Sequence, residues 1–296
     1  MRTKGLDRRH FLGTSALAAS AALLGRGQRA RAAETAAPSG PVPPRQFRLG
    51  MVTYNMAKDM DLPTLIKTCQ EANLEGVELR TTHKHGVEPS LSAVERKEVR
   101  QRFADSDVVL WGLGTTCEFH SPDPAEVKRQ IKICGDFCQL AEDVGAAGIK
   151  VRPNGLPDKV PVEKTLEQIG KALIECGKIA DDHGVEIFVE VHGRGTAHPP
   201  YLRTIMDHCG HPKVGVCWNS NDGDVKDGSV EEYFMLLRPF LKSCHITELY
   251  RVDYNYPYDE LFTLMRRTRY DRFTLAEIQG NNDPVRFMRY YRALWG

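Results

Sequence analysis

Eight short apolar runs recur along the chain from Phe47 onward, and they alternate with amphipathic segments. The runs are rich in β-branched and aromatic residues, which is typical of buried strands. They are Phe47–Tyr54, Gly76–Leu79, Val108–Thr115, Ala147–Val151, Val185–Val191, Val214–Trp218, Leu241–Thr247 and Phe273–Ile278. The segments between them, for example Leu62–Ala72, Ala125–Val144 and Val162–Asp182, repeat apolar residues with the period of a helix. Alternating strands and helices predict a parallel sheet, and eight such units in residues 47–296 predict a single (β/α)8 TIM barrel of the α/β class.

The first 32 residues resemble a twin-arginine signal peptide. Arg8 and Arg9 are followed by Phe11-Leu12, by an apolar run over Thr14–Leu24, and by a cleavage-like Ala30-Arg31-Ala32. The run has about half of the roughly 20 apolar residues that a membrane span needs, so we expect no stable membrane association after cleavage. The resemblance implies a periplasmic or otherwise exported protein that meets the twin-arginine translocase. The Ala/Pro-rich residues 33–46 are interpreted as a flexible linker.

Composition narrows the classes of partner. Residues 1–32 contain seven Lys/Arg and one Asp, so the remaining chain has 33 basic and 38 acidic residues and a net charge of −5. An acidic chain is a poor match for nucleic acid, whose phosphates supply most of the affinity. No glycine-rich nucleotide-binding motif follows a predicted strand. The eight cysteines include no Cys-x-x-Cys pair, and a chain of this size can bury a core without disulfides, so we expect buried free thiols.

Polar side chains stand where the last four predicted strands end. The fifth strand delivers Glu190 and His192, the sixth Asn219, the seventh His245 and the eighth Glu277. From Glu190 onward the four potential ligands are separated by 29, 26 and 32 residues, about one strand–helix unit each. In a barrel the carboxyl ends of the strands meet at one rim, where active sites lie. Two carboxylates, an amide oxygen and an imidazole there suit one divalent ion, with Mn²⁺ as first choice and Mg²⁺, Co²⁺ or Zn²⁺ as alternatives. The competing interpretation is a rim of ordinary salt-bridged glutamates.

The barrel domain resembles the xylose-isomerase-like superfamily, which includes sugar-phosphate isomerases/epimerases and ketose 3-epimerases. In those enzymes a Glu, an Asp, a His and a second Glu on successive late strands hold one metal ion. The resemblance assigns these positions to Glu190, Asn219, His245 and Glu277, with Asn219 standing where the family usually has Asp. Asp222 stands where the family commonly has a substrate-binding His. The resemblance also implies that Glu190 and Glu277 form the acid/base pair.

Several further residues are candidates for contact with a carbohydrate. His192 alternates in phase with Glu190 and so should face the same mouth, as a base or as a supporting residue. Lys150 could bind a polar substrate or neutralise Glu190, and alternation alone does not decide whether it points inward. The predicted substrate-binding set is His83, His85, Lys150, Arg152, Asp222, Glu248 and Arg251. For His83 and His85 the alternative is a solvated loop, and for Glu248 and Arg251 an ordinary ion pair.

The function that this pattern favours is a metal-dependent sugar isomerase or epimerase, which abstracts a proton next to a carbonyl through an enediolate. One alternative is a lyase or hydrolase that cleaves 3-keto-glycosides by β-elimination, for which His192 would be well suited. Another is a catalytically inactive sugar-binding barrel, which Asn219 would favour. An endonuclease of the same fold would need more histidines than this rim supplies. The sequence leaves the oligomeric state open.

Overall fold

The computed structural model describes residues 37–251, 253 and 255–296 of the chain. The predicted signal peptide and the first part of the predicted linker lie outside the described residues. Within the described part of the linker, the guanidinium of Arg45 lies over the Trp295 ring at 3.9 Å from its centroid and donates a 2.8 Å hydrogen bond to the Trp295 carbonyl. Arg45, shortly before the first strand, therefore contacts the end of the C-terminal helix.

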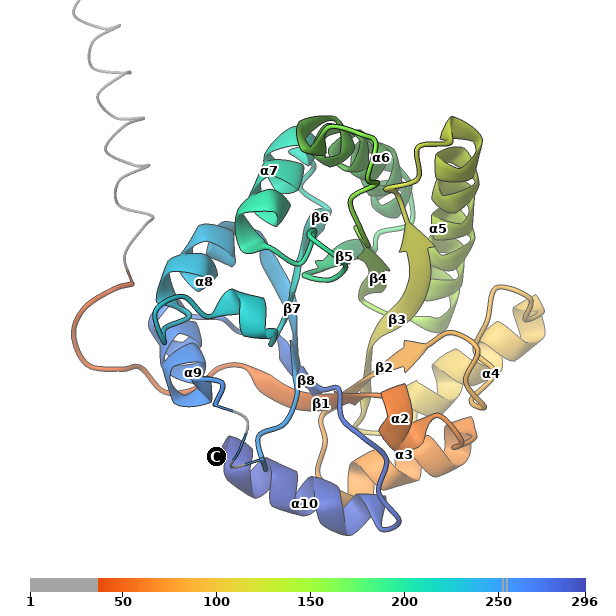
Figure 1. Cartoon of the computed structure of the whole chain (residues 1–296). Helices are drawn as coiled ribbons and strands as arrows, with labels where there is room; N and C mark the ends of the chain where they lie inside the picture. Colours follow the sequence, from red (N-terminus) through yellow and green to blue (C-terminus); the bar gives the residue numbers. More distant parts are fainter. Residues whose placement is uncertain (1–36, 252, 254) are drawn as a thin grey trace, which may run out of the picture.

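Eight parallel strands close into a barrel in sequence order, which confirms the predicted fold (Figure 1). The ring is closed by pairing of the first strand with the last, for example Gly50 with Leu275. Each observed strand overlaps its predicted run, and the ends coincide or differ by at most three residues. The strands are β1 Arg48–Val52, β2 Gly76–Arg80, β3 Val109–Glu118, β4 Gly148–Arg152, β5 Glu186–Glu190, β6 Val214–Asn219, β7 Leu241–Ile246 and β8 Phe273–Ala276.

Helices surround the barrel (Figure 1). Several begin where an acidic side chain caps free backbone N–H groups: Asp123 accepts from Ala125 N at 2.9 Å, and Asp283 accepts from Arg286 N at 3.1 Å. None of the described helices is both long enough and apolar enough to cross a membrane. The helices are α2 Tyr54–Ala57, α3 Leu62–Glu71, α4 Ala93–Ala104, α5 Pro124–Val144, α6 Val162–Asp182, α7 Pro199–Cys209, α8 Glu231–Leu237, α9 Tyr258–Arg267 and α10 Pro284–Trp295, with 3₁₀ turns η1 Asp222–Asp224 and η2 Arg238–Phe240.

Aromatic side chains fill the part of the barrel interior that lies toward the amino ends of the strands. Trp111 from β3 stacks on Phe188 from β5, with ring centroids 5.5 Å apart, and meets Phe273 from β8 at 4.9 Å. The indole Nε1 of Trp111 donates a 3.0 Å hydrogen bond to Ser243 Oγ, so its polar atom is satisfied. Side chains two residues apart on a strand share a face, so Glu190 lies one step beyond Phe188 toward the carboxyl end. The predicted metal site at the carboxyl end of the barrel therefore lies next to a layer of packed aromatic side chains.

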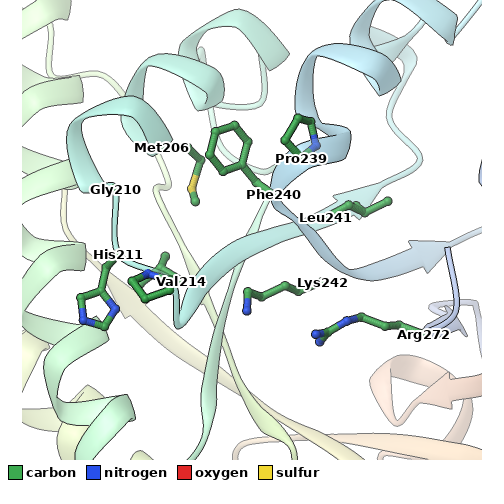
Figure 2. A pocket seen from close by; sticks show the side chains of 10 residues that line it. Met206, Gly210, His211, Val214, Pro239, Phe240, Leu241, Lys242 and Arg272 are labelled. Atoms are coloured by element: carbon green, nitrogen blue, oxygen red, sulfur yellow. The ribbon is translucent and has the colours of Figure 1, made fainter. Parts of the chain in front are cut away.

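A cavity of about 340 Å³ lies at the opposite end of the barrel, near the first residues of β6 and β7 (Figure 2). Lys242 and Arg272 give its wall a basic character. Both cations form ion pairs with Glu186, the first residue of β5. This one carboxylate offsets part of their charge and connects both cations to β5, so a role in stabilising the barrel base accounts for the three side chains.

All eight cysteines are free thiols in buried positions. Burial raises the pKa of the Cys69 thiol to about 12 and that of the Cys117 thiol to about 11. Thiolates are the reactive form of cysteine, so these side chains act as small apolar groups in the core.

Candidate metal centre and active-site cavity

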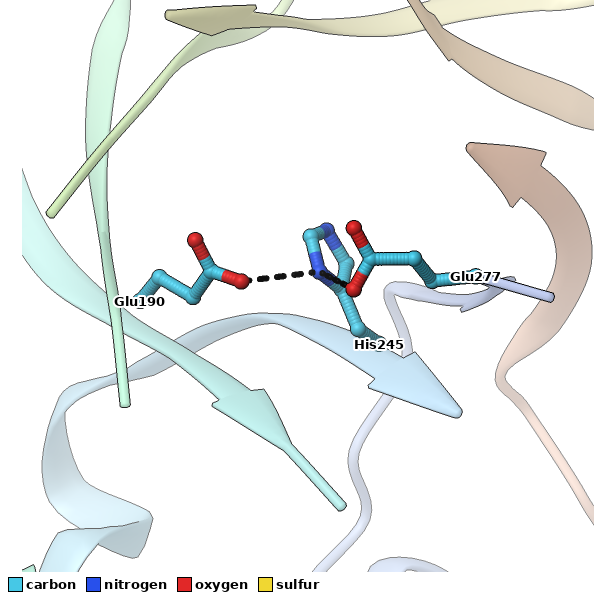
Figure 3. Close-up of side chains that lie close together, drawn as sticks. All are labelled: Glu190, His245 and Glu277. Carbon is cyan, nitrogen blue, oxygen red and sulfur yellow. Dashed lines mark ion pairs between the residues drawn. The ribbon is translucent and has the colours of Figure 1, made fainter. Parts of the chain in front are cut away.

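Three predicted metal ligands converge at the carboxyl end of the barrel. His245 Nδ1 lies 3.6 Å from Glu190 Oε1 and 3.4 Å from Glu277 Oε2, so that the two carboxylates approach one ring nitrogen (Figure 3). One ligand atom from each residue lies within 4.8 Å of the other two. The fourth predicted ligand, Asn219, donates from Nδ2 to Glu190 Oε1 at 3.3 Å. The structure thus brings together the four side chains that the sequence places one unit apart.

The geometry around His245 fits a metal ligand. Its Nδ1 is buried and has no hydrogen-bond partner in the part of the chain that the structure describes. Its other ring nitrogen, Nε2, lies 3.2 Å from Glu78 Oε2 and can donate to it. A carboxylate that accepts from one ring nitrogen fixes the tautomer and directs the lone pair of the other. A possible metal site therefore exists at Glu190, His245 and Glu277, and their donor atoms are of the kinds that divalent ions take.

Glu78 is a site residue that sequence reasoning missed. It occupies the middle of β2 and is completely buried. Room for it comes from two glycines of β3: a Cβ on Gly114 would lie 2.8 Å from Glu78 Oε1, and one on Gly112 would lie 3.6 Å from Glu78 Oε2. The available signal was a carboxylate inside an otherwise apolar strand, which needs a buried partner.

Lys150 is the buried counter-ion of Glu190. Its Nζ donates to Glu190 Oε2 at 2.7 Å, and the two side chains are 2% and 3% exposed. Burial alone would lower the pKa of Lys150, but Glu190 and Glu78 outweigh it and raise that pKa above its ordinary value. Burial would raise the pKa of Glu190, whereas Lys150 and His245 hold it well below its usual range. Both members of the pair are therefore charged, and Glu190 Oε1 remains directed at His245.

His192 is held by a chain of polar side chains on the cavity wall. Its Nδ1 lies 2.7 Å from Asn154 Oδ1. Asn154 in turn donates from Nδ2 to Glu118, which also accepts from Arg152 Nη2 at 2.6 Å. Because the Asn154 oxygen can only accept, His192 Nδ1 carries the proton of the neutral ring and Nε2 carries the lone pair. Burial holds the pKa of His192 below its ordinary value despite the opposing charge of Glu190, which favours this neutral form.

These groups open into a cavity of about 400 Å³ at the carboxyl end of the strands. Of the predicted site residues, seven line it: Lys150, Arg152, Glu190, His192, Asn219, Glu248 and Glu277. His245 lies beneath this wall and is fully buried. Further lining residues that the sequence did not single out are Tyr54, Arg80, Ser220, Asn221, Thr247 and Gln279.

Four predicted substrate-binding residues do not line this cavity. His85 is buried and spans its own loop, with Nε2 bonded to the Arg80 carbonyl at 2.8 Å. His83 Nδ1 pairs with Thr53 Oγ1 at 2.9 Å. His85 thus holds the backbone at the end of β2, whereas His83 contacts the side-chain hydroxyl of Thr53, the residue after β1. Asp222 is exposed in η1, and Arg251 is exposed and pairs with Asp253 at 2.8 Å.

Comparisons with known proteins agree with this architecture. A 3-keto-D-glucoside 4-epimerase from E. coli superposes with a TM-score of 0.70 at 13% identity, covering 83% of this chain and 98% of that one. A D-psicose 3-epimerase from Clostridium cellulolyticum H10, solved with D-tagatose, gives 0.71 at 13% identity, covering 84% and 97%. The IOLI protein, whose structure holds a zinc atom, gives 0.62 at 13% identity, covering 84% and 95%.

At these identities the likeness shows the fold. Among curated proteins, none matches this sequence significantly. Residues 66–290 match the sequence pattern described as the xylose isomerase-like TIM barrel, and this stretch covers most of the strands and all four proposed metal ligands. The chain therefore belongs to the xylose isomerase-like TIM barrel family.

Proposed function

We propose that this protein is a metal-dependent enzyme that isomerises or epimerises a carbohydrate by removing a proton next to a carbonyl group. The observation that carries the proposal is the buried Nδ1 of His245, which makes no hydrogen bond within the described residues and lies 3.6 Å and 3.4 Å from the carboxylates of Glu190 and Glu277. Two of the similar structures are named as sugar epimerases. Mn²⁺ is the proposed ion, with Mg²⁺, Co²⁺ and Zn²⁺ as alternatives.

Glu190, His245, Glu277 and the amide of Asn219 would hold the ion. A divalent ion bound there supplies positive charge that offsets the negative charge developing on a substrate carbonyl oxygen during proton removal. Glu78 keeps His245 in the tautomer that presents Nδ1 to the carboxylates.

The two glutamates are unequal as acid/base groups. Glu190 Oε2 is engaged by Lys150, which keeps this carboxylate ionised. Glu277 follows β8, lines the cavity, and has a side chain that is 13% exposed, against 3% for Glu190. Glu277 is therefore the group that reaches a substrate proton more readily, and Glu190 serves the opposite face.

A second candidate function is cleavage of a 3-keto-glycoside by β-elimination. The observation that favours it is the Glu118–Asn154–His192 chain, which fixes one ring nitrogen of His192 and leaves the other for a substrate. β-Elimination begins with removal of a proton next to the carbonyl, and the Nε2 lone pair of His192 on the wall of the cavity is placed to accept that proton.

The test is deuterium incorporation and product analysis in D₂O with Mn²⁺-loaded protein on ketoses and on 3-keto-glycosides. We expect deuterium at the carbon next to the carbonyl of a ketose, and loss of this exchange in Glu277→Gln but not in the surface control Glu232→Gln. Release of free aglycone from 3-keto-glycosides would support the second function instead. Bound metal without exchange or cleavage on either panel would point to an inactive sugar-binding barrel.

We also propose export through the twin-arginine translocase, which rests on Arg8-Arg9, the apolar run after them and Ala30-Arg31-Ala32. In a bacterial host, the expected result is a shortened protein in the periplasmic fraction. Arg8→Lys/Arg9→Lys should leave full-length protein in the cytoplasm. Equal fractionation of both versions would contradict the proposal.

A further inference from the structure

Arg80 is the cation on the cavity wall whose charge is least well matched. The wall carries three cationic side chains. Lys150 Nζ lies 2.7 Å from Glu190, and Arg152 Nη2 lies 2.6 Å from Glu118. Arg80 Nη1 comes no nearer to a carboxylate than 3.8 Å, at Glu277 Oε1, which is beyond hydrogen-bond distance. Its guanidinium makes no hydrogen bond within the described part of the chain.

Hydrogen bonds to the backbone of Arg80 fix the position from which its side chain extends. Its backbone N–H donates to Thr53 Oγ1 at 3.0 Å, and its carbonyl accepts from His85 Nε2 at 2.8 Å. The guanidinium lies over the Tyr54 ring, 5.1 Å from the centroid. Opposite, a Cβ on Gly114 would lie 3.0 Å from Arg80 Cγ, so β3 leaves space for this side chain to extend. An arginine held in this way is a preorganised donor that loses little freedom on binding a ligand.

We infer that the substrate of this cavity carries a carboxylate group and that Arg80 binds it, which makes the substrate class an acidic sugar such as a hexuronate. The inference rests on the proposed function of the cavity and names the substrate class for it. The Arg80 side chain is 24% exposed. Solvent therefore reaches the guanidinium, which makes no hydrogen bond within the described residues, and a ligand can replace water at its N–H donors. Its planar fork of N–H donors matches the two oxygens of a carboxylate.

The neighbouring metal centre strengthens the same conclusion. Glu277 is the nearest carboxylate to Arg80, and it is also a proposed ligand of the divalent ion. When the Glu277 carboxylate binds the ion, its negative charge offsets the charge of the ion and no longer neutralises Arg80. Hydroxyl groups of a neutral sugar could accept hydrogen bonds from Arg80 but would leave this charge unmatched. A substrate carboxylate supplies both the acceptors and the charge.

The experiment compares matched acidic and neutral ketoses. Calorimetry on Mn²⁺-loaded protein measures the affinity for D-fructuronate against D-fructose and for D-tagaturonate against D-tagatose. We expect each uronate to bind about 10- to 100-fold more tightly than its ketose, the usual range for a charged hydrogen-bonded contact. Arg80→Gln should remove this preference and change ketose affinity by less than about threefold. The control Arg203→Gln removes one positive charge from the outer helix α7 and should keep the preference.

Several results would overturn the inference. These are equal affinity for uronates and ketoses in the wild type, equal losses for both in Arg80→Gln, or no measurable uronate binding. Tighter, Arg80-dependent binding of fructose 6-phosphate than of fructuronate would assign a phosphate in place of the carboxylate. Thermal melting confirms that each variant is folded, and Arg80→Lys, which keeps the charge without the fork, replaces Arg80→Gln if the latter does not fold.

The same samples separate this inference from the proposed function. If uronates bind with the expected preference but exchange no deuterium in D₂O, the proposed isomerase or epimerase function is contradicted, while the proposal of a carboxylate-binding site still holds. If ketoses exchange deuterium and bind as tightly as uronates, the proposed function holds and the carboxylate-binding site is contradicted.

Discussion

The ammonium of Lys150 lies 2.7 Å from Glu190 Oε2, and both side chains are almost entirely shielded from water. The pair joins β4 to β5 at the point where the barrel interior changes from aromatic packing to polar chemistry. It also divides the two oxygens of Glu190: one binds Lys150, while the other faces His245 and Asn219. The carboxylate is thereby held ionised and oriented before any ion or substrate arrives.

Replacing Lys150 should therefore destabilise the protein. Breaking a buried ion pair leaves the remaining charge uncompensated and costs about 3–5 kcal/mol. We expect Lys150→Met to lower the free energy of unfolding by about this amount in metal-free protein, measured by urea denaturation. The double variant Lys150→Met/Glu190→Gln should recover part of the loss, because no charge is left alone. A single variant that loses less than about 1 kcal/mol would show that the pair is not buried as described.

Glu78 should control metal affinity without binding the ion. In Glu78→Gln a neutral amide replaces the charged carboxylate that accepts the hydrogen bond from His245 Nε2, so this hydrogen bond becomes weaker. Loss of such a supporting partner typically weakens metal binding about 10- to 100-fold. Calorimetry with Mn²⁺ measures this change, and Glu71→Gln on the outer helix α3 is the matched control. Unchanged affinity in Glu78→Gln would mean that the contact with His245 does not orient the ring.

Metal binding should strengthen as pH rises. Burial lowers the pKa of His245, but Cys217, Glu78 and Glu277 outweigh it and hold the pKa well above its ordinary value, so the metal-free ring keeps its second proton to a higher pH than an ordinary histidine does. The ion must displace this proton, so the affinity should increase about tenfold per pH unit while about one proton leaves. Calorimetry in two buffers of different ionisation enthalpy counts that proton. Binding at pH 6–8 without proton release would contradict the prediction.

The same raised pKa has a consequence for the metal-free fold. Because the folded state binds the His245 proton more tightly than the unfolded chain, the resulting stability is fully present below the unfolded pKa of about 6.5. It is lost as pH rises through the folded value. Urea denaturation of metal-free protein should therefore show falling stability on the alkaline side, and His245→Gln should flatten this slope. An equally steep slope in His245→Gln would assign the effect to other groups.

Asn219 makes the centre one negative charge poorer than a site with aspartate at this position. Asn219→Asp should tighten Mn²⁺ binding, because a carboxylate is a stronger ligand for a divalent ion than an amide. The same change should destabilise metal-free protein, since the new carboxylate would replace the hydrogen bond to Glu190 with like-charge repulsion. Metal titration should thus show a higher Mn²⁺ affinity in this variant, and urea denaturation should show a lower free energy of unfolding for its metal-free form. Weaker metal binding in Asn219→Asp would indicate that this residue does not face the ion.

The fold and the metal centre could be predicted because their signals are local. Each strand is an apolar run of its own, and Glu190, His245 and Glu277 each stand at or near the end of one. The local signal of Glu78, a carboxylate inside an apolar strand, did not reveal its role, since its partner His245 is 167 residues away and the room for it comes from glycines of another strand. The inward direction of Lys150 likewise depends on where the barrel places β4 beside β5.

The histidines after β2 show the opposite difficulty. His83 and His85 are chemically versatile and follow a strand, yet the loop turns both toward backbone and hydroxyl partners near the strand end. The residue that reaches the cavity from β2 is Arg80, the last of the strand itself. Sequence spacing identifies which strand contributes, whereas loop hydrogen bonds decide which side chain does.

The most direct test of the account is the metal stoichiometry and affinity of the purified protein and of three single variants. Elemental analysis and Mn²⁺ calorimetry should give one divalent ion per chain in the wild type. Glu190→Gln, His245→Ala and Glu277→Gln should each bind at least about 100-fold more weakly, since each removes a ligand. The exposed His208→Ala should bind as the wild type does. A wild-type protein that takes up no ion, or three variants that bind as tightly as the control, would contradict the metal centre and the chemistry proposed from it.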